Sequence, residues 1–417
     1  MSELSTDPYK GVRDFYPPEW AQMQAVFEVL RSTLKRYGYE EYNASPLERA
    51  ELYESKGNEE IVNEQTYTFL DRGERRVTLR PEMTPTLARM VAAKRRELVY
   101  PLRWFSLPNV FRYERPQKGR LREHYQLNVD LLGVKDAKAD GEIVVIAHAL
   151  LAAFGAKNED FVIRINSRAL MNAAIAASGM GKEAAHAYLR LLDKKSKMPP
   201  EEFAAAQGAI TSIDPLALIA QDEKGVKEEK AKMLALIDAF HARGMKNVVF
   251  DPSVVRGFDY YTGIVFEIFD TDPANPRSIF GGGRFDGLVA LFGGEPIPAV
   301  GFGMGDVTLI DFLTTHKLLP EVQGAPDIYL GTPAETDIVS AEDTATTLRA
   351  SGLSVLVNVT ERSLGDQVRE ANKRGIPYFA AVGENEKHSK TLRVKRLSTG
   401  EERSLSLADV AAYIRGT

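Results

Sequence analysis

The chain has 417 residues, of which 44% are hydrophobic and 27% charged, and this composition predicts two or three globular domains in water. It contains no cysteine and six scattered histidines, so disulfides and cysteine nucleophiles are excluded and no zinc site is expected. The net charge of −5 does not by itself indicate a nucleic-acid partner. Without a signal peptide or an apolar run of membrane-spanning length, the chain is expected to be cytoplasmic and to have no membrane partner.

The first element expected is a helix that begins near Glu19, because proline and acidic residues are favoured in a first turn. Apolar residues recur at spacings of three and four through residues 20–34, and Gly38 ends the helix. Residues 39–44 are then expected to be extended as far as Pro46. Any amphipathic helix that precedes a strand would have the same pattern.

Residues 77–84, with the sequence VTLRPEMT, combine an apolar start with polar groups suited to binding an amine. The Glu82 carboxylate and the Thr84 hydroxyl can both accept hydrogen bonds from an ammonium group. Residues 86–96 are predicted to continue as a helix. This segment is therefore a candidate binding element at the start of a helix.

Residues 111–130 carry a dense basic loop between two apolar strands. A hairpin with such a loop could bind phosphates and approach an RNA end, because guanidinium groups match phosphate geometry. The alternative interpretation is a solvated basic loop without a ligand. The basic residues are Arg112, Arg115, Lys118, Arg120 and Arg122.

Residues from about 165 to 250 are rich in alanine and charged residues and predict helices with solvated faces. Residues 256–267 follow, in which an arginine, an acid and two tyrosines precede a β-branched and aromatic run. That run predicts a buried strand with polar groups at its start. The alternative is a strand edge, with Asp259 as a turn residue and the tyrosines as packing.

Glycine-rich segments occur at residues 280–289 and 300–306. The first is predicted to be a turn that enters an apolar segment. The second could suggest a dinucleotide-binding loop, but no parallel strand–turn–helix unit surrounds it, and a P-loop sequence is absent from the chain. Neither segment therefore predicts a nucleotide-binding fold of the Rossmann or P-loop type.

Residues 319–326 are predicted to be a linker because of their proline and glycine content. Beyond them, strands and helices alternate, which predicts a small α/β domain. The expected strands are residues 327–331, 353–359 and 378–382, and the expected helices are residues 341–351 and 364–374.

Several of these segments resemble motifs of the histidyl-tRNA synthetases, a family of class II aminoacyl-tRNA synthetases. Residues 256–262, RGFDYYT, resemble the histidine-specific motif, and residues 111–120, FRYERPQKGR, match the second class II motif in its histidyl form. Residues 280–286, FGGGRFD, resemble a glycine-rich motif of the same family. The N-terminal helix, strand and Pro46 resemble the first class II motif, and residues 362–367 resemble the class IIa anticodon-binding domain.

The resemblance implies roles for the residues of these motifs around ATP and tRNA. Arg112 would bind the α-phosphate of ATP and, together with Arg256, would be catalytic, with Mg²⁺ on the phosphates. The tRNA acceptor end would meet the loop that contains Arg115 and Gln117. The remaining ATP contacts would be the adenine amino group with Glu114, the outer phosphates with Arg120, and the adenine ring with His124.

The resemblance also implies a set of residues around the histidine substrate. An acidic side chain facing the imidazole can accept from its N–H group and favour its charged form. The histidine-binding residues implied are Glu82, Thr84, Gln126, Asp130, Tyr260 and Tyr261.

Three positions depart from the family pattern. Asp130 stands where a glutamate is usual, so the pocket must be slightly narrower there or contain a bridging water. His124 stands where an aromatic ring usually stacks on adenine. Thr308 stands where the third class II motif has an arginine for the γ-phosphate, so either another basic residue such as Arg120 compensates or ATP handling is altered.

The predicted fold is an α+β class II catalytic domain, an antiparallel sheet flanked by helices, over residues 1–322, with a helical insertion at about 168–250. An α/β anticodon-binding domain is expected over residues 325–417. The resemblance implies a homodimer that activates L-histidine with ATP and transfers it to the 3′-terminal adenosine of tRNA(His). The alternatives are a histidine-sensing regulatory paralogue of ATP phosphoribosyltransferase, to which Thr308 points, and a class II synthetase for another amino acid.

Overall fold

The computed structural model describes residues 4–54, 65–195, 198–255, 261–322, 324–389 and 391–416. The chain divides into two compact units, Met1–Glu321 and Val322–Thr417. Across these described ranges, no helix combines the length and the apolar character that crossing a bilayer requires.

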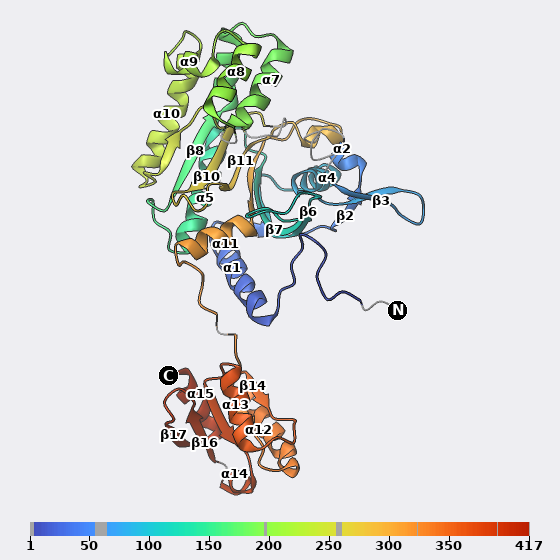
Figure 1. The fold of residues 1–417 in the computed structure, drawn as a ribbon, viewed down its shortest axis with the longest axis vertical. Helices are drawn as coiled ribbons and strands as arrows, with labels where there is room; N and C mark the ends of the chain where they lie inside the picture. Colours follow the sequence, from blue (N-terminus) through green and yellow to red (C-terminus); the bar gives the residue numbers. More distant parts are fainter. Residues whose placement is uncertain are drawn as a thin grey trace. The chain divides into compact units, whose positions relative to one another are not determined.

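In the described part of the first unit, nine strands form one sheet (Figure 1). The strands lie in the order β1, β5, β7, β12, β11, β10, β8, β9, and β6 pairs with β7. Neighbours are antiparallel except where β1 joins β5 and where β9 joins β8. The bounds are β1 Glu40–Glu41, β5 Leu102–Ser106, β6 Asn109–Phe111, β7 Glu123–Leu132, β8 Phe161–Ser167, β9 Val248–Phe250, β10 Ile264–Asp270, β11 Ser278–Arg284 and β12 Ala299–Gly305.

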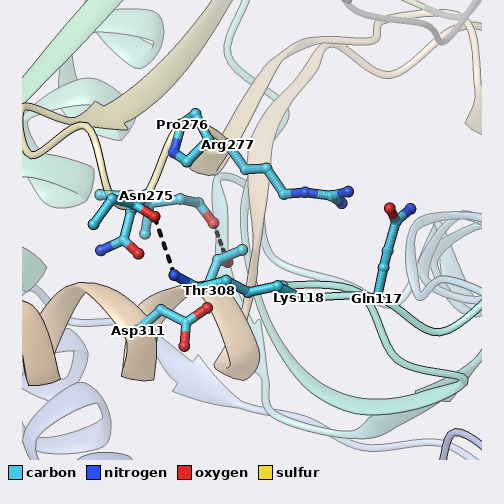
Figure 2. A pocket seen from close by; sticks show the side chains of 10 residues that line it. Gln117, Lys118, Asn275, Pro276, Arg277, Thr308 and Asp311 are labelled. Carbon is cyan, nitrogen blue, oxygen red and sulfur yellow. Dashed lines mark hydrogen bonds between the residues drawn. The ribbon is translucent and has the colours of Figure 1, made fainter.

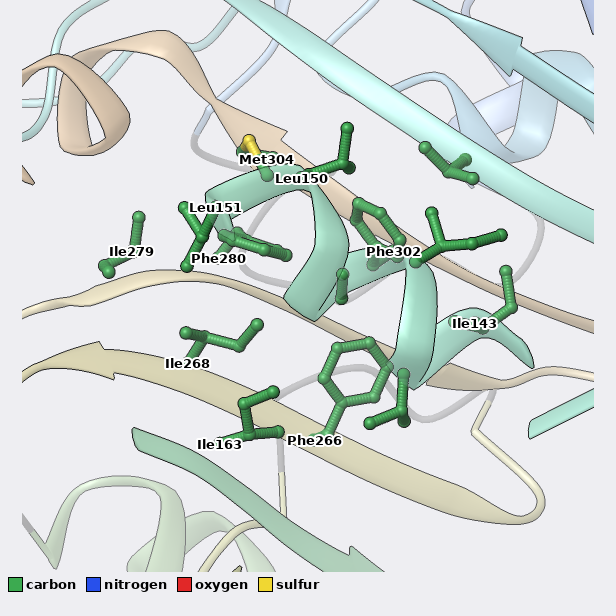
Figure 3. Packing of buried hydrophobic residues seen from close by; sticks show 14 of the residues in the cluster. Ile143, Leu150, Leu151, Ile163, Phe266, Ile268, Ile279, Phe280, Phe302 and Met304 are labelled. Atoms are coloured by element: carbon green, nitrogen blue, oxygen red, sulfur yellow. The ribbon is translucent and has the colours of Figure 1, made fainter. Parts of the chain in front are cut away.

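Helices cover one face of this sheet. Helix α5 (Ala137–Ala153) packs on β7 and β12, and helix α1 (Pro17–Arg36) packs on α5. Side chains of α5 such as Leu150 lie against Phe266 and Phe302 from the strands, and all three are almost fully buried (Figure 3). Removing this much apolar surface from water is the main term that stabilises the unit.

The other face of the sheet carries polar residues. Along β7, Leu127, Val129 and Leu131 belong to the helix-covered core, so the alternating residues point to the opposite face. Those residues are Gln126, Asn128 and Asp130. The strand thus has one apolar face that packs and one polar face that is available for binding.

A smaller sheet borders this polar face. Strand β4 (Arg76–Leu79) pairs with both β2 (Leu47–Arg49) and β3 (Tyr67–Leu70), and α2 (Glu51–Glu54) follows β2. Helix α4 (Thr84–Lys94) packs on the 3-10 helix η2 (Val289–Phe292). The loop that contains Glu82 is therefore held between β4 and α4.

Five helices follow β8; the first four gather beyond one end of β8, β10 and β11, and the fifth runs back beside β8 and β9 (Figure 1). The first four have a core around Tyr188, whose hydroxyl donates to Asp214 at 2.8 Å, and the fifth packs mainly into the core of the large sheet. The Ser167 and Asp214 side chains cap the first turns of α6 and α9. The bounds are α6 Arg168–Ala177, α7 Lys182–Asp193, α8 Pro200–Ile210, α9 Pro215–Ala220 and α10 Val226–Ala242.

The prediction of a turn at residues 280–289 was wrong, because residues 278–284 form the interior strand β11. A side chain at Gly282 would have its Cβ 2.0 Å from the Gly301 carbonyl oxygen, so these glycines permit close packing between strands. Strand β12 pairs antiparallel with β11 and β7 and continues into α11 (Asp306–Thr315), which excludes a dinucleotide-binding unit at residues 300–306.

The second unit is a five-stranded sheet between helices, and the predicted α/β alternation is confirmed. Strands β14 (Val355–Val357), β13 (Ile328–Gly331) and β15 (Tyr378–Ala381) are parallel, and β16 (Thr391–Arg396) and β17 (Glu402–Ser406) extend the sheet antiparallel. One buried cluster joins the sheet to α12 and α15, and another joins it to α13. The helices are η3 Glu335–Asp337, α12 Ile338–Ala350, α13 Leu364–Lys373, α14 Glu384–Ser389 and α15 Leu407–Arg415.

Candidate active site

Six of the side chains predicted to bind substrates line one cavity of about 120 Å³ on the polar face of the large sheet, here called the first cavity. They come from the loop before α4 and its first residue, from the β6–β7 hairpin and from the segment that leads into β10. The six are Glu82, Thr84, Arg112, Gln126, Asp130 and Tyr261.

Glycines form the floor of the first cavity. Gly301 lies opposite Asp130 in the strand register, and a Cβ there would be 2.3 Å from the Asp130 Oδ1 atom. A Cβ at Gly303 would be 3.2 Å from the Gln126 amide. The absence of side chains at Gly301 and Gly303 leaves the space into which the β7 side chains project.

The Asp130 carboxyl is buried, with 4% of its surface exposed. Burial raises its pKa from 3.8 to about 8, because the charged form loses its hydration. In the described part of the chain, no group donates a hydrogen bond to this carboxyl. A buried acid without a donor is expected to bind a ligand that supplies a hydrogen bond or a positive charge.

Arg112 is fixed at the edge of the first cavity, because its Nε donates to the Pro81 carbonyl oxygen at 2.9 Å. Burial, followed by the positive charges of Arg112 and Arg13, lowers the pKa of His124 to about 3. The His124 ring is therefore neutral at physiological pH, and Arg112 and Arg13 make the local field positive.

Glu114 and Arg120, which the sequence assigns to opposite ends of ATP, bind each other in this structure. The guanidinium of Arg120 donates to both carboxylate oxygens of Glu114, one of them at 2.6 Å. Glu114 is buried, whereas the Arg120 side chain is 40% exposed. Neither residue lines the first cavity.

The acceptor-end residues lie in the loop between β6 and β7. Arg115 and Gln117 are exposed, and the Gln117 backbone pairs with Arg120 across the loop. Gln117 also lines a second cavity of about 350 Å³, which includes Thr308 (Figure 2). Arg256 and Tyr260 fall outside the described residues, so their assigned roles stay predictions.

Asn128, Phe285 and Phe302 line the first cavity and were not predicted to do so. Asn128 lies between Gln126 and Asp130 at the two-residue spacing of a strand, and that spacing was the signal for it. Phe285 belongs to the glycine-rich motif of residues 280–286, whereas no sequence signal marked Phe302. Of the side chains that the structure describes, no three or more histidine, aspartate or glutamate residues are grouped to hold a metal ion.

Comparison with known proteins places the whole chain in one family. A family model described as histidyl-tRNA synthetase matches residues 11–307, and a model described as anticodon binding domain matches residues 329–417. A histidine–tRNA ligase of Leptospira biflexa is 40% identical over 99% of this chain and 98% of its own length. A histidine–tRNA ligase of Thermoplasma volcanium is 36% identical over 99% of both chains.

The fold agrees with that of a solved member of the family. The crystal structure of histidyl-tRNA synthetase from Nostoc sp. PCC 7120 superposes with a TM-score of 0.79 over 99% of both chains, at 24% identity. The predicted fold class, a sheet flanked by helices with a separate anticodon-binding domain, is confirmed. The chain belongs to the histidyl-tRNA synthetase family.

Proposed function

We propose that the chain is a histidine–tRNA ligase, which joins histidine to the AMP portion of Mg²⁺-bound ATP and then transfers the histidyl group to the 3′-terminal adenosine of tRNA(His). The observation that carries the proposal is the lining of the first cavity, which combines two acidic side chains, Glu82 and Asp130, with the basic side chain of Arg112. Such a cavity fits an amino acid whose ammonium group and basic side chain face the two acids, together with a phosphate group that faces the arginine.

Histidine would lie in the first cavity with its ammonium group near Glu82 and Thr84. Its imidazole would face Asp130 and Gln126, which project from the same face of β7. Because the pKa of Asp130 is raised to about 8, this carboxyl retains its proton at pH 7 until a partner arrives. An imidazole that accepts this proton would form a buried ion pair, and this would favour histidine over uncharged amino acids.

Adenylate formation would begin when a histidine carboxylate oxygen attacks the α-phosphorus of ATP, and pyrophosphate would leave with its bonding electrons. Arg112 would stabilise the negative charge that develops on the α-phosphate, and Arg256 would act beside it. The terminal hydroxyl of tRNA would then attack the histidyl carbonyl, and AMP would leave. Positioning and charge stabilisation suffice, so the chain needs no nucleophile of its own.

ATP would have to separate Glu114 from Arg120, since these two residues bind each other in this structure. Glu114 would then accept from the adenine amino group while Arg120 turned toward the outer phosphates, with His124 against the adenine ring. The acceptor end of tRNA would approach Arg115 and Gln117, and the second unit would bind the anticodon.

We also propose a homodimer that acts in the cytoplasm. Leu47, Leu291 and Phe292 line one broad surface hollow and are each at least 36% exposed, and exposed apolar groups of this kind mark association surfaces. Replacing Phe292 with aspartate should halve the mass measured by analytical ultracentrifugation. A wild-type chain that sediments as a monomer at micromolar concentration would contradict the dimer.

The activity is tested by histidine-dependent exchange of labelled pyrophosphate into ATP without tRNA. Exchange with histidine alone among the twenty amino acids is the expected result. If the purified protein binds histidine but catalyses no exchange, the regulatory-paralogue alternative replaces the ligase. Exchange with another amino acid would mean that the substrate is wrong although the reaction is right.

A further inference from the structure

The reaction leaves one charge requirement open beyond Arg112 and Arg120, which is the cation for the γ-phosphate at the position that Thr308 occupies. Pyrophosphate gains negative charge as it leaves, and a positive side chain beyond Arg112 would stabilise it. In the first turn of α11, Asp306 binds Arg13 at 2.7 Å and the Thr308 hydroxyl donates to the Ile279 carbonyl at 2.6 Å. Neither Asp306 nor Thr308 can supply the positive charge.

If the α-phosphate of ATP lies at the first cavity, its β- and γ-phosphates would extend toward the second cavity. Strand β12 supplies Gly301 and Gly303 to the first cavity, and the helix that follows it supplies Thr308 to the second. A Cβ at Gly305, between them, would be 3.6 Å from the His124 ring and 3.9 Å from the Thr308 hydroxyl. The two cavities are thus successive along one strand, with the predicted ATP-contacting histidine at their junction.

Arg277 is the arginine that lines the second cavity. A Cβ at Gly119 would be 3.2 Å from the Arg277 Cδ atom and 3.6 Å from the Thr308 methyl, so both side chains meet at the basic loop. In Figure 2 the guanidinium extends over Thr308 toward Gln117 and away from Asp311, the cavity's one carboxylate. Within the described ranges, no acceptor binds this guanidinium.

The other basic groups near the cavity are already bound. Arg120 forms a two-point ion pair with Glu114, and the Lys118 ammonium donates to the Ala274 carbonyl at 3.1 Å (Figure 2). Arg277 is exposed and has its fork of donors available for a phosphate. It can therefore bind an anion without first breaking an internal contact.

We propose that Arg277, which immediately precedes β11, binds the β- and γ-phosphates of ATP and supplies the charge that Thr308 cannot. The inference deepens the proposed function by naming the residue that holds the leaving pyrophosphate. Arg277 lies just before β11, which packs on α11, and its side chain lines the same cavity as Thr308.

The test compares Arg277→Ala with the wild type in pyrophosphate exchange and in direct nucleotide titration. Loss of one charged phosphate contact should raise the KM for ATP by about 10- to 100-fold and leave the KM for histidine unchanged. Binding of AMP, which lacks the outer phosphates, should not change. Arg277→Lys should recover part of the ATP affinity, and adding Thr308→Arg to Arg277→Ala should recover more.

Arg72→Ala is the matched control, since Arg72 is an exposed arginine in the β3–β4 turn, outside both cavities. It should leave the KM for ATP, the KM for histidine and the binding of AMP unchanged. The inference is overturned if Arg277→Ala binds ATP as tightly as the wild type, or if it loses ATP and AMP affinity equally. If the wild type binds ATP through Arg277 but catalyses no exchange, the proposed ligase activity is refuted, whereas the proposed phosphate-binding role of Arg277 still holds.

Discussion

Asp130 shows how the surroundings of one side chain change its chemistry. An aspartate with an ordinary pKa of 3.8 would be ionised at pH 7, but burial raises the pKa of this carboxyl to about 8. The resemblance of residues 111–130 to a family motif implies that Asp130 faces the imidazole of histidine. The sequence could not reveal the protonation state, because that depends on β12 and the residues packed around the carboxyl.

We predict that Asp130→Asn stabilises the chain at neutral and alkaline pH while weakening histidine binding. The folded state holds the Asp130 proton up to about pH 8 and the unfolded state releases it near pH 3.8, so wild-type stability falls as the pH rises between these values. Asparagine does not titrate, so it removes this loss of unfolding free energy, which amounts to at most about 1.4 kcal/mol for each unit of pKa shift. Calorimetric denaturation temperatures at pH 5, 7 and 8.5 would measure it.

The histidine dissociation constant of the same variant should rise about 10- to 100-fold, because a charged contact is replaced by a neutral one. Asp238→Asn, on the exposed side of α10, is the control and should alter neither quantity. A variant whose stability advantage does not grow between pH 5 and pH 8.5 would show that Asp130 is not the buried titrating group.

The Glu114–Arg120 pair is a second feature of single residues that the sequence did not reveal. Both were assigned to ATP, and the structure pairs them with each other. Six residues separate them in the sequence, and only the bend of the β6–β7 loop brings the guanidinium onto the carboxylate. Local pattern alone cannot say whether two oppositely charged groups in a loop bind a ligand or one another.

At the scale of the elements, the close packing of the central strands depends on glycines in β11 and β12, where a side chain would collide with the neighbouring strand. Periodicity and turn residues predicted α1, α13, β13 and β15 to within a few residues. The same rules failed for β11, because three consecutive glycines indicate a turn when only local preference is considered. Close approach of β12 overrides that preference.

We predict that Gly301→Ala destabilises the first unit by about 1–3 kcal/mol and abolishes histidine binding. Its Cβ would be 2.3 Å from the Asp130 carboxylate and 2.5 Å from the Val129 carbonyl oxygen, and a backbone atom cannot easily move aside. Gly303→Ala meets only the Gln126 side chain, at 3.2 Å, and should cost less stability. Urea denaturation and histidine titration would measure both effects.

Gly287→Ala is the control, because nothing lies within 4 Å of the added Cβ. It should fold and bind histidine like the wild type. Equal stability of Gly301→Ala and Gly287→Ala would mean that β7 and β12 separate easily, and the glycine floor would then not define the cavity.

At the scale of the whole molecule, each unit has its own apolar core. The first is built around α5 and the large sheet, and the second around β13 and its flanking helices. Units with separate cores are expected to fold independently. We therefore expect that adenylate formation and anticodon binding can be separated by cutting the chain between the two units.

We predict that residues 1–321 alone retain histidine-dependent pyrophosphate exchange and lose most tRNA charging. Removing one of two linked binding units should reduce kcat/KM for tRNA by about 100-fold or more, because the linkage raises the effective concentration of the second contact. Steady-state aminoacylation and exchange assays on the same preparation would test this. Equal losses in both assays would show that the second unit serves adenylate formation as well.

The sequence by itself indicated the family, most of the helices and strands and a set of candidate substrate-binding side chains, because these depend on motif identity and on periodicity along the chain. Only the tertiary structure decided which of those side chains share a cavity, that burial raises the pKa of Asp130, that Glu114 and Arg120 are paired, and that Arg277 lines the second cavity together with Thr308. The physical reason is that burial, charge pairing and close approach arise between segments far apart in the chain. Local preferences carry no information about such contacts.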